Sequence, residues 1–268
     1  MIRDITIGQY YPAKSVIHRM DPRTKLFGTL IFIIISVFLF HTVVGYAVAT
    51  VFLAGMILIS TVPVKFIFKG LKAIFMILLI TMVFNILLTP GEVLWKIGIF
   101  TITKEGISMA VRMAIRLIYL VIGSSLMTLT TTPNQLTDGL EKSLRPLNKI
   151  HVPVHEIAMM MSIALRFIPI LLEETDKIMK AQIARGADFE SGNLIQKVKN
   201  MVPLLVPLFI SAFRRANDLA MAMEARCYHG GDDRTQMKPL HYAKRDHIAY
   251  LVLFAYLAVA IGFRVMGW

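Results

Sequence analysis

Residues 26–62 read LFGTLIFIIISVFLFHTVVGYAVATVFLAGMILISTV, an apolar run that is interrupted only near His41 and Thr42. As a single helix, at about 1.5 Å per residue, this run would be roughly 55 Å long, whereas the hydrocarbon core of a bilayer is about 30 Å thick. The run therefore predicts two membrane-spanning helices, Leu26–Phe40 and Val43–Val62, joined by a tight turn.

Three further apolar stretches of similar length follow along the chain. One runs from about Leu71 to Leu88 and ends at Thr89-Pro90-Gly91, and another runs from about Ile107 to Leu129 before Thr132-Pro133. The last, Ile248–Val265, lies at the end of the sequence. Proline and glycine at these positions are typical helix stops. The sequence therefore predicts an all-α integral membrane protein with about five transmembrane helices.

The composition agrees with a membrane protein. Hydrophobic residues make up 56% of the 268 positions, whereas a soluble domain usually holds about 45–50%. The first 25 residues are polar, so no cleavable signal peptide is expected. The single cysteine, Cys227, leaves no partner for an internal disulfide. The net charge of +12 is typical of membrane proteins that retain lysine and arginine on the cytoplasmic side. No nucleic-acid partner is expected, because no basic run alternates with aromatic residues.

Lysine and arginine in the short connections predict the orientation of the spans. Basic residues are concentrated before the first span and between the second and third, namely Arg3, Lys14, Arg19, Arg23, Lys25, Lys65, Lys69 and Lys72. The opposite side holds fewer, namely Lys96, Lys104 and Arg264. Since short cytoplasmic loops are enriched in basic residues, the N-terminus is predicted to lie in the cytoplasm. With five spans, the C-terminus then lies outside.

Residues 131–246 are too apolar for an ordinary loop and too charged to span a membrane. They contain three amphipathic pieces, Gln135–Asn148, Val154–Arg185 and Leu194–Arg226, and the two long pieces begin apolar and become charged toward their ends. This pattern predicts helices that start against the membrane and extend into the cytoplasm. Prolines lie inside the long pieces and predict kinks or breaks there, at Pro169, Pro203 and Pro207.

The predicted domain organisation has four parts. These are a cytoplasmic N-terminal segment (1–25), a four-helix transmembrane region (26–130), cytoplasmic coupling helices (131–246) and a C-terminal transmembrane helix (247–268).

The two long cytoplasmic pieces end alike. Residues 181–186 and 222–227 share the pattern Ala-x-x-Ala-Arg-small, and their arginines lie 41 residues apart. A single arginine at a helix C-terminus is explained by the helix dipole, which contributes about 0.3–1 kcal/mol. Two arginines in matching frames indicate docking instead, because small alanines admit a partner and a guanidinium binds a carboxylate through two hydrogen bonds. The candidate docking residues are Ala184, Arg185, Gly186, Ala225, Arg226 and Cys227.

These tips, together with two other motifs, carry a resemblance to a known family. The other motifs are Asp21-Pro22-Arg23-Thr24-Lys25-Leu26 before the first span and Arg166-Phe167-Ile168-Pro169 in the second cytoplasmic piece. Over essentially its whole length, the chain resembles the transmembrane scaffold subunit, EcfT, of energy-coupling factor transporters, which are ABC-type importers of vitamins and metal ions. The second tip departs from the family pattern, because Cys227 stands where glycine is usual.

The resemblance implies a non-catalytic subunit in a bacterial plasma membrane, with no cofactor and no bound metal. It implies that the arginine tips dock in grooves of two ATP-binding cassette subunits. It also implies that one substrate-binding membrane protein, the S component, lies against the membrane-side faces of the coupling helices. Residues expected to contact it are Met159, Met160, Met161, Leu165 and Pro169. ATP binding would then move the tips and shift the helices, so that the S component reorients. Ordinary membrane packing is an alternative reason for the many methionines.

Two other classes stay open as alternatives, a stand-alone intramembrane enzyme and a conventional ABC permease. The enzyme is disfavoured because the chain has no phosphate-binding G-x-x-x-x-G-K-[ST] loop and no His-Glu-x-x-His zinc motif. His151 and His155 are four residues apart, but Pro153 between them argues against a shared helix face. A second possible set of metal ligands is His229, Asp232, Asp233 and His241, but Gly230-Gly231 within it indicates a linker turn. Ser124-Ser125 has no matched base.

A permease would need polar side chains along the spans. Asn85 is the main polar group of the third span, and Arg112 and Arg116 share one face of the fourth. Snorkelling of the two arginines to the interface, or a structural contact, is favoured over a transport role. The sequence therefore favours a scaffold over a permease.

Overall fold

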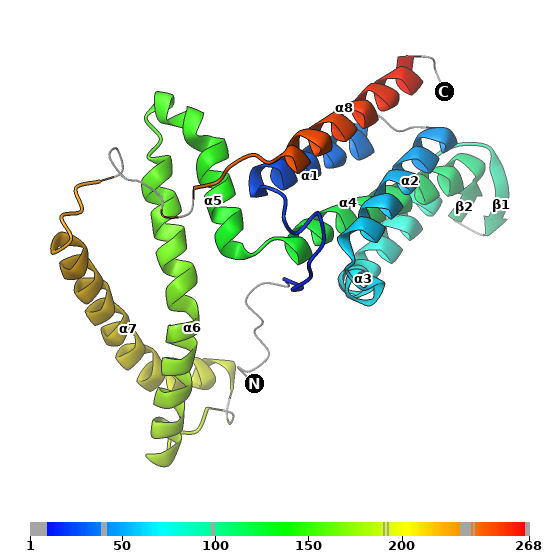
Figure 1. Ribbon diagram of the computed structural model, residues 1–268. Helices are drawn as coiled ribbons and strands as arrows, with labels where there is room; N and C mark the ends of the chain where they lie inside the picture. The colour runs from blue at the N-terminus through cyan, green and yellow to red at the C-terminus, as the bar shows by residue number, and fades with distance from the viewer. Residues whose placement is uncertain are drawn as a thin grey trace. The chain divides into compact units, whose positions relative to one another are not determined.

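The structure is a computed structural model. It describes residues 10–38, 42–97, 100–189, 191, 193–230, 237 and 239–265. The chain divides into two compact units (Figure 1). The first comprises Met1–Ile7 and Glu141–Pro239, and the second comprises Gly8–Leu140 and Leu240–Trp268. We call them the coupling unit and the membrane unit. Within the described residues, the chain passes between them twice, inside one helix at Leu140–Glu141 and at Pro239–Leu240.

The membrane unit is almost wholly helical, which confirms the all-α class. Its elements are α1 (Pro22–Phe38), α2 (Val43–Ser60), α3 (Val64–Leu88), β1 (Val93–Ile97), β2 (Phe100–Thr103), α4 (Lys104–Thr130), the first part of α5 (Pro133–Leu144) and α8 (Lys244–Val265). Each predicted apolar stretch falls in a helix over its described residues, except that α2 ends at Ser60, two residues before the expected Val62. The third begins earlier than expected, because α3 starts at Val64 and bends by 57° between Val64–Lys72 and Ile74–Leu88.

Among the described residues, three helices are long and apolar enough to cross a membrane, or four if the bent α3 counts as one span. Two of the three, α4 and α8, belong to the membrane unit, and the third is α6 (Val154–Ala184) of the coupling unit. The sequence analysis places α6 in the cytoplasm, because charged residues fill its second half. With 17 and 18 residues, α1 and α2 would each be about 26 Å long, slightly less than a hydrocarbon core of roughly 30 Å.

A short hairpin between α3 and α4 is absent from the sequence-based prediction, which treats this connection as a loop. Strands β1 and β2 are antiparallel, with Val93 opposite Thr103 and Ile97 opposite Phe100. Both strands are rich in the β-branched and aromatic residues that favour extended backbone. Runs of four and five residues are too short to stand out beside long apolar helices.

The core of the membrane unit lies where α1, α2, α4 and α8 meet. Fully buried alanines, Ala49 on α2 and Ala260 on α8, allow the helices to approach closely. Large rings fill the space between them, and Phe52 stacks on Tyr256 with ring centroids 4.2 Å apart. Tyr119 of α4 donates its hydroxyl to the Tyr46 carbonyl of α2. Packing and buried polar contacts therefore fix α4 against α2.

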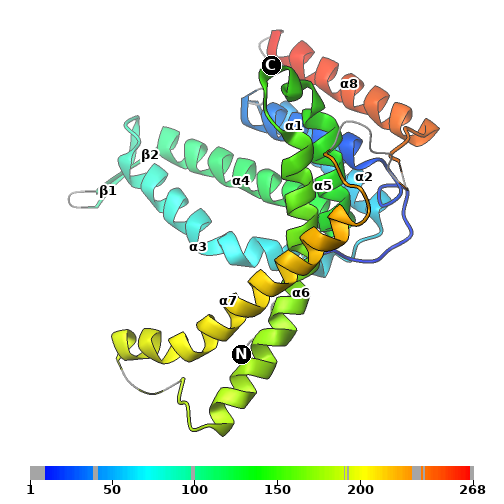
Figure 2. The ribbon, with the colours of Figure 1, turned by 90° about the vertical axis from the view of Figure 1, so that its left-hand side faces the viewer.

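The coupling unit is built around two long helices. After the end of α5 and a 3₁₀ turn (Arg145–Ile150), α6 (Val154–Ala184) and α7 (Leu194–Glu224) pack against each other (Figures 1 and 2). Both helices are continuous through their internal prolines, so the expected breaks do not occur. Figure 2 shows the first turns of α7 at an angle to the rest of the helix, a bend of the kind proline produces.

Candidate docking site

The two tips have the same backbone structure. In the first, the Ala187 amide donates to the Gln182 carbonyl over 3.0 Å, and in the second the Tyr228 amide donates to Met223 over 3.1 Å. The residue after each arginine has a positive φ, +89° at Gly186 and +55° at Cys227. This is the Schellman ending, in which a left-handed residue lets late amides satisfy free carbonyls of the last turn.

The shared ending places both arginines directly before the left-handed residue that ends the helix. Arg185 and Arg226 are exposed, as are the alanines before them and the residues after them. Neither guanidinium has a hydrogen bond or ion pair recorded within the described part of the chain. Each tip is therefore an accessible cation beside small side chains, the arrangement that a carboxylate-bearing partner requires.

The tips lie at opposite ends of the α6–α7 pair. Figures 1 and 2 both show the end of α6 near the connection to α7, whereas the end of α7 lies far from it. One small groove could not hold both tips at once. This separation fits two docking sites rather than one.

Polar contacts between α6 and α7 hold the tips relative to each other. Arg215 of α7 pairs with Glu174 of α6 over 3.2 Å. Closer to the first tip, the Gln182 amide donates to the Pro203 carbonyl over 3.2 Å. That carbonyl would normally accept from residue 207, but Pro207 has no N–H to donate. Gln182 of α6 therefore supplies the hydrogen bond that a proline removes from α7.

The proposed S-component contacts lie along α6. Met160 and Met161 are 58% and 42% exposed, Pro169 is exposed, and Met159 and Leu165 are half-buried. On α7, large apolar side chains recur at helical spacing and are exposed, including Val202, Val206, Phe209, Ile210 and Phe213. Exposed apolar faces of this extent mark a surface that contacts lipid or protein.

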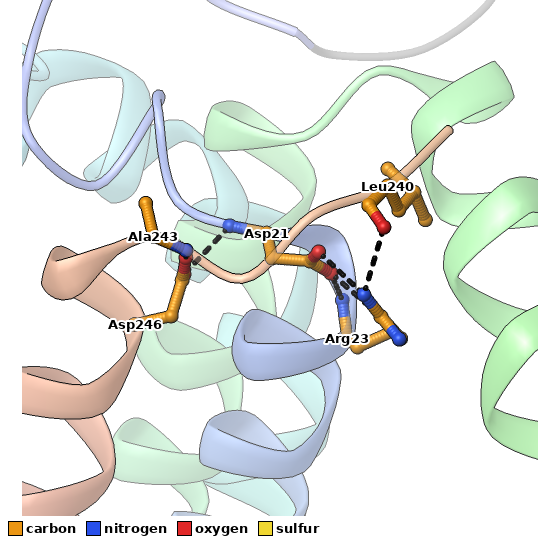
Figure 3. A network of polar contacts seen from close by, with 5 residues as sticks. All are labelled: Asp21, Arg23, Leu240, Ala243 and Asp246. Carbon is orange, nitrogen blue, oxygen red and sulfur yellow. Dashed lines mark hydrogen bonds and ion pairs between the residues drawn. The ribbon is translucent and has the colours of Figure 1, made fainter. Parts of the chain in front are cut away.

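The motif Asp21-Pro22-Arg23 forms a polar anchor at the base of the membrane unit (Figure 3). Asp21 caps α1 by accepting the Arg23 amide over 2.9 Å, and Pro22 occupies the first helical position, where its missing N–H costs nothing. The Asp21 amide donates to Asp246 over 2.8 Å, and the other Asp246 oxygen accepts the Ala243 amide over 2.8 Å. Asp246 is only 1% exposed, so the anchor joins the starts of α1 and α8 in the interior.

Arg23 extends the anchor to the chain that enters α8. Its guanidinium binds both oxygens of Asp21, over 3.1 and 2.9 Å, and donates to the Leu240 carbonyl over 3.4 Å. It also lies over the Tyr242 ring, 4.0 Å from the centroid. In the sequence, Asp21 served only as a mark of resemblance and Arg23 served for that and for the orientation of the spans, whereas Asp246 and Tyr242 were missed. An aspartate just before the expected span Ile248–Val265 was the available signal of a helix start.

The residues weighed for catalysis or metal binding do not form a common site where they are described. His155 of α6 pairs with Glu141 over 2.8 Å, whereas His151 precedes α6 and ends the 3₁₀ turn. His229 and His241 are exposed, and Asp232 and Asp233 lie outside the described residues. No group of three or more potential metal ligands occurs among the residues that were placed.

Two of the polar side chains of the spans bond within their own helices. The Asn85 amide donates to the Thr81 carbonyl over 2.7 Å, and the Ser124 hydroxyl donates to Leu120 over 2.6 Å. Arg112 is exposed on α4 and Arg116 is half-buried. These contacts agree with a structural role for the polar side chains.

The fold and the tips together define an α-helical membrane component with two exposed cationic helix ends. A protein-family model described as cobalt transport protein, CbiQ, matches residues 13–238. Relatives described as energy-coupling factor transporter transmembrane protein EcfT align over almost the whole chain. One from Clostridium kluyveri is 57% identical over 267 residues, covering 99% of this chain and 98% of the relative. One from Bacillus subtilis is 48% identical over 261 residues, covering 96% and 98%. The chain belongs to the CbiQ family and, within it, to the EcfT transmembrane proteins of energy-coupling factor transporters.

Proposed function

We propose that this chain is a non-catalytic scaffold that couples ATP hydrolysis by two ATP-binding cassette subunits to reorientation of one S component. The transporter would import a vitamin or another micronutrient. The observation that carries the proposal is the pair of tips, identical in backbone structure, exposed, and separated at opposite ends of the α6–α7 pair.

Each tip would insert its arginine into a groove of one ATP-binding subunit. A buried carboxylate in that groove would bind the guanidinium through two parallel hydrogen bonds. Arg185 would serve one subunit and Arg226 the other, with Ala184, Gly186, Ala225 and Cys227 allowing close approach. Because the tips are fixed to one α6–α7 pair through Gln182 and Glu174, closure of the two subunits would move the whole pair.

The exposed apolar faces of α6 and α7 would meet the S component. Met159, Met160, Met161, Leu165 and Pro169 would form part of this contact on α6, and methionine suits a surface that accepts more than one partner. The basic residues of the short connections support an N-terminus in the cytoplasm and a C-terminus outside. In this orientation the coupling unit, α6 included, lies on the ATP side of the plasma membrane.

The test is co-expression of the tagged chain with the ATP-binding subunits encoded in the same genome. The wild-type chain should co-purify with both subunits, and Arg185→Glu/Arg226→Glu should lose them. The loss of the buried pair between guanidinium and carboxylate at each tip should cost about 2–5 kcal/mol of binding free energy. The variant with one tip changed should retain a single subunit type or a weakened complex.

The matched control is Lys180→Glu/Arg214→Glu, which makes the same change of charge on exposed positions of α6 and α7 away from the tips. It should keep both subunits. Equal loss in both double variants would indicate a general effect of charge and refute docking by the tips. Retention of both subunits by the tip variant would refute it as well.

A further inference from the structure

A cavity of about 230 Å³ lies inside the membrane unit, between the segment before α1 and helices α1, α2, α4 and α8. Its inner wall is apolar and includes Phe32, Phe52 and Leu253. A single buried water needs only about 10–15 Å³, and an apolar cavity of larger size stays dry and accepts apolar guests. The cavity is therefore suited to a hydrocarbon group.

The cavity is partly open, and we expect its open side to face the bilayer. Ile59 of α2 and Ile248 and Val252 of α8 line it and are 51%, 62% and 46% exposed. Exposed isoleucine and valine on helices of a membrane unit contact acyl chains. A chain from the surrounding lipid can therefore enter sideways, without crossing a polar region.

One end of the cavity is polar and basic. The start of α1, the end of α4 and the start of α8 meet there, as the bond from the Lys25 ammonium to the Thr130 carbonyl shows (2.8 Å). Lys25, Thr130 and the exposed Arg245 all line this end. The lining contains two cationic side chains and no carboxylate. Two carboxylates lie outside the lining, where Asp246 accepts two amides and Asp21 holds Arg23. Their charges still act on Lys25, so the exposed Arg245 supplies most of the positive charge for an anionic ligand.

Two polar groups at this end have capacity to spare. Thr24 lines the cavity and is 3% exposed, yet its hydroxyl has no hydrogen-bond partner among the described residues. A buried hydroxyl without a partner is costly and calls for a ligand or water. The Lys25 ammonium uses two of its three donors, on the His18 and Thr130 carbonyls.

We propose that this cavity binds an anionic glycerophospholipid, with one acyl chain between α1, α2 and α8 and the phosphate beside Arg245, Lys25 and Thr24. Charge complementarity at one end and an apolar wall at the other match the two halves of such a lipid. The lipid would come from the leaflet on the side of residues 16–25, which is the inner leaflet in the orientation proposed above. The binding site does not depend on the docking of ATP-binding subunits.

The glycine at position 28 provides a direct test. Gly28 lines the cavity, and a Cβ added there would meet no atom within 4 Å. A leucine at this position should therefore occupy the space of the acyl chain without disturbing its neighbours. Gly55 of α2 is the matched control, because an added Cβ there also meets nothing within 4 Å and the residue does not line the cavity.

The full chain, purified with whatever subunits accompany it, would be offered equal amounts of dioleoyl phosphatidylglycerol and dioleoyl phosphatidylcholine. Lipid retained after detergent exchange would be measured by native mass spectrometry. The wild type and Gly55→Leu should retain phosphatidylglycerol in preference, whereas Gly28→Leu should retain several-fold less of either lipid. Ala249→Phe is a second change in the lining and should reduce lipid retention as Gly28→Leu does. Agreement between the two variants makes misfolding of one of them an inadequate explanation.

The headgroup is tested separately. Arg245→Gln should reduce the preference for phosphatidylglycerol and leave total lipid nearly unchanged, whereas the exposed neighbour Lys244→Gln, which lies outside the lining, should change neither. The proposal is overturned if wild type retains no lipid, which would point to a partner side chain as the occupant. It is also overturned if Gly28→Leu retains as much lipid as the wild type. The same holds if Lys244→Gln and Arg245→Gln have the same effect on the preference for phosphatidylglycerol.

Discussion

The backbone demands a positive φ at both tips, but this conformation costs the two residues found there different amounts of free energy. Gly186 adopts its positive φ without strain, whereas Cys227 holds φ +55°, a conformation that costs a residue with a Cβ about 1–2 kcal/mol. We expect Gly186→Ala to open the first tip, so that amides of residues 185–187 exchange with solvent about fivefold faster or more. Cys227→Gly should slow exchange at the second tip. Hydrogen-exchange mass spectrometry of the two tip peptides measures both.

The control for the second tip is Cys227→Ala, which removes the thiol and keeps the strained backbone. Its exchange should stay close to that of the wild type. Faster exchange in both cysteine variants would show that the thiol, rather than the backbone, holds the tip. The sequence identified both tips through the arginines and showed that Cys227 stands where glycine is usual in the family. In the structure, Cys227 adopts the left-handed conformation although it is not glycine.

His18 makes the segment before α1 sensitive to pH. Its Nε2–H donates to the Tyr11 carbonyl over 3.0 Å, so Nδ1 accepts from the Ser15 hydroxyl over 2.7 Å. Burial lowers the pKa of the imidazole below 6.5, the bond to Tyr11 opposes this shift, and the Lys25 charge adds to it. The neutral ring is thus favoured on folding. The neutral His18 ring contributes its full stabilisation above pH 6.5, the ordinary pKa of histidine. This stabilisation is lost as the pH falls through the lowered pKa of His18 in the folded protein.

We therefore expect the thermal midpoint of the wild type to fall between about pH 7.5 and pH 5, by more than that of His18→Gln. The comparison variant His241→Gln, which changes an exposed histidine, should follow the wild type. A pH dependence that is the same in all three proteins would contradict the role given to His18. Thermal unfolding in detergent at each pH, followed by tryptophan or dye fluorescence, provides the measurement.

At the scale of elements, α6 compensates for a defect in α7. Pro207 deprives the Pro203 carbonyl of its helical donor, and Gln182 replaces it from the neighbouring helix. Gln182→Ala should lower the free energy of unfolding by about 0.5–1.5 kcal/mol and loosen α6 against α7. Gln196→Ala, on an exposed site of α7, is the control. Equal denaturant midpoints for the two variants would mean that water serves the carbonyl equally well.

The same contact explains why the sequence overestimated the effect of proline. Reading Pro169, Pro203 and Pro207 along one chain predicts kinks or breaks, because the lost hydrogen bonds are local, but the helices are continuous. The donor that replaces one of them lies 21 residues away, on another helix, where no pattern in α7 reveals it. The long apolar helices were predicted well because their signal is local and repeated many times. The β1–β2 hairpin and the Asp246 anchor depend on a few residues and a distant partner, so they were missed.

At the scale of the whole molecule, both passages of the chain between the units touch one turn of the membrane unit. At the first passage, a Cβ added to Gly139 of α5 would lie 2.9 Å from the Pro22 Cβ, so helix and turn are in close contact. At the second, the Leu240 carbonyl accepts from Arg23. Under the proposed function, motion of the coupling helices would be passed to the membrane unit along these connections, and we expect Asp21-Pro22-Arg23 to take part because it contacts both.

Arg23→Gln should therefore separate assembly from transport, provided that the proposed function holds. The variant loses the paired bond to Asp21 and the contact with Leu240, but it leaves both tips intact. ATP-binding subunits should co-purify in wild-type amounts, whereas ATP-driven uptake of the S component's substrate into proteoliposomes should fall about tenfold, within the range of typical coupling energies. Arg19→Gln, which changes an exposed arginine of the same segment, should transport normally.

Wild-type uptake by Arg23→Gln would show that the anchor only stabilises the fold. Loss of the ATP-binding subunits would show that Arg23→Gln acts on assembly. That result would contradict the prediction, because Arg23 lies in the membrane unit and the tips lie in the coupling unit.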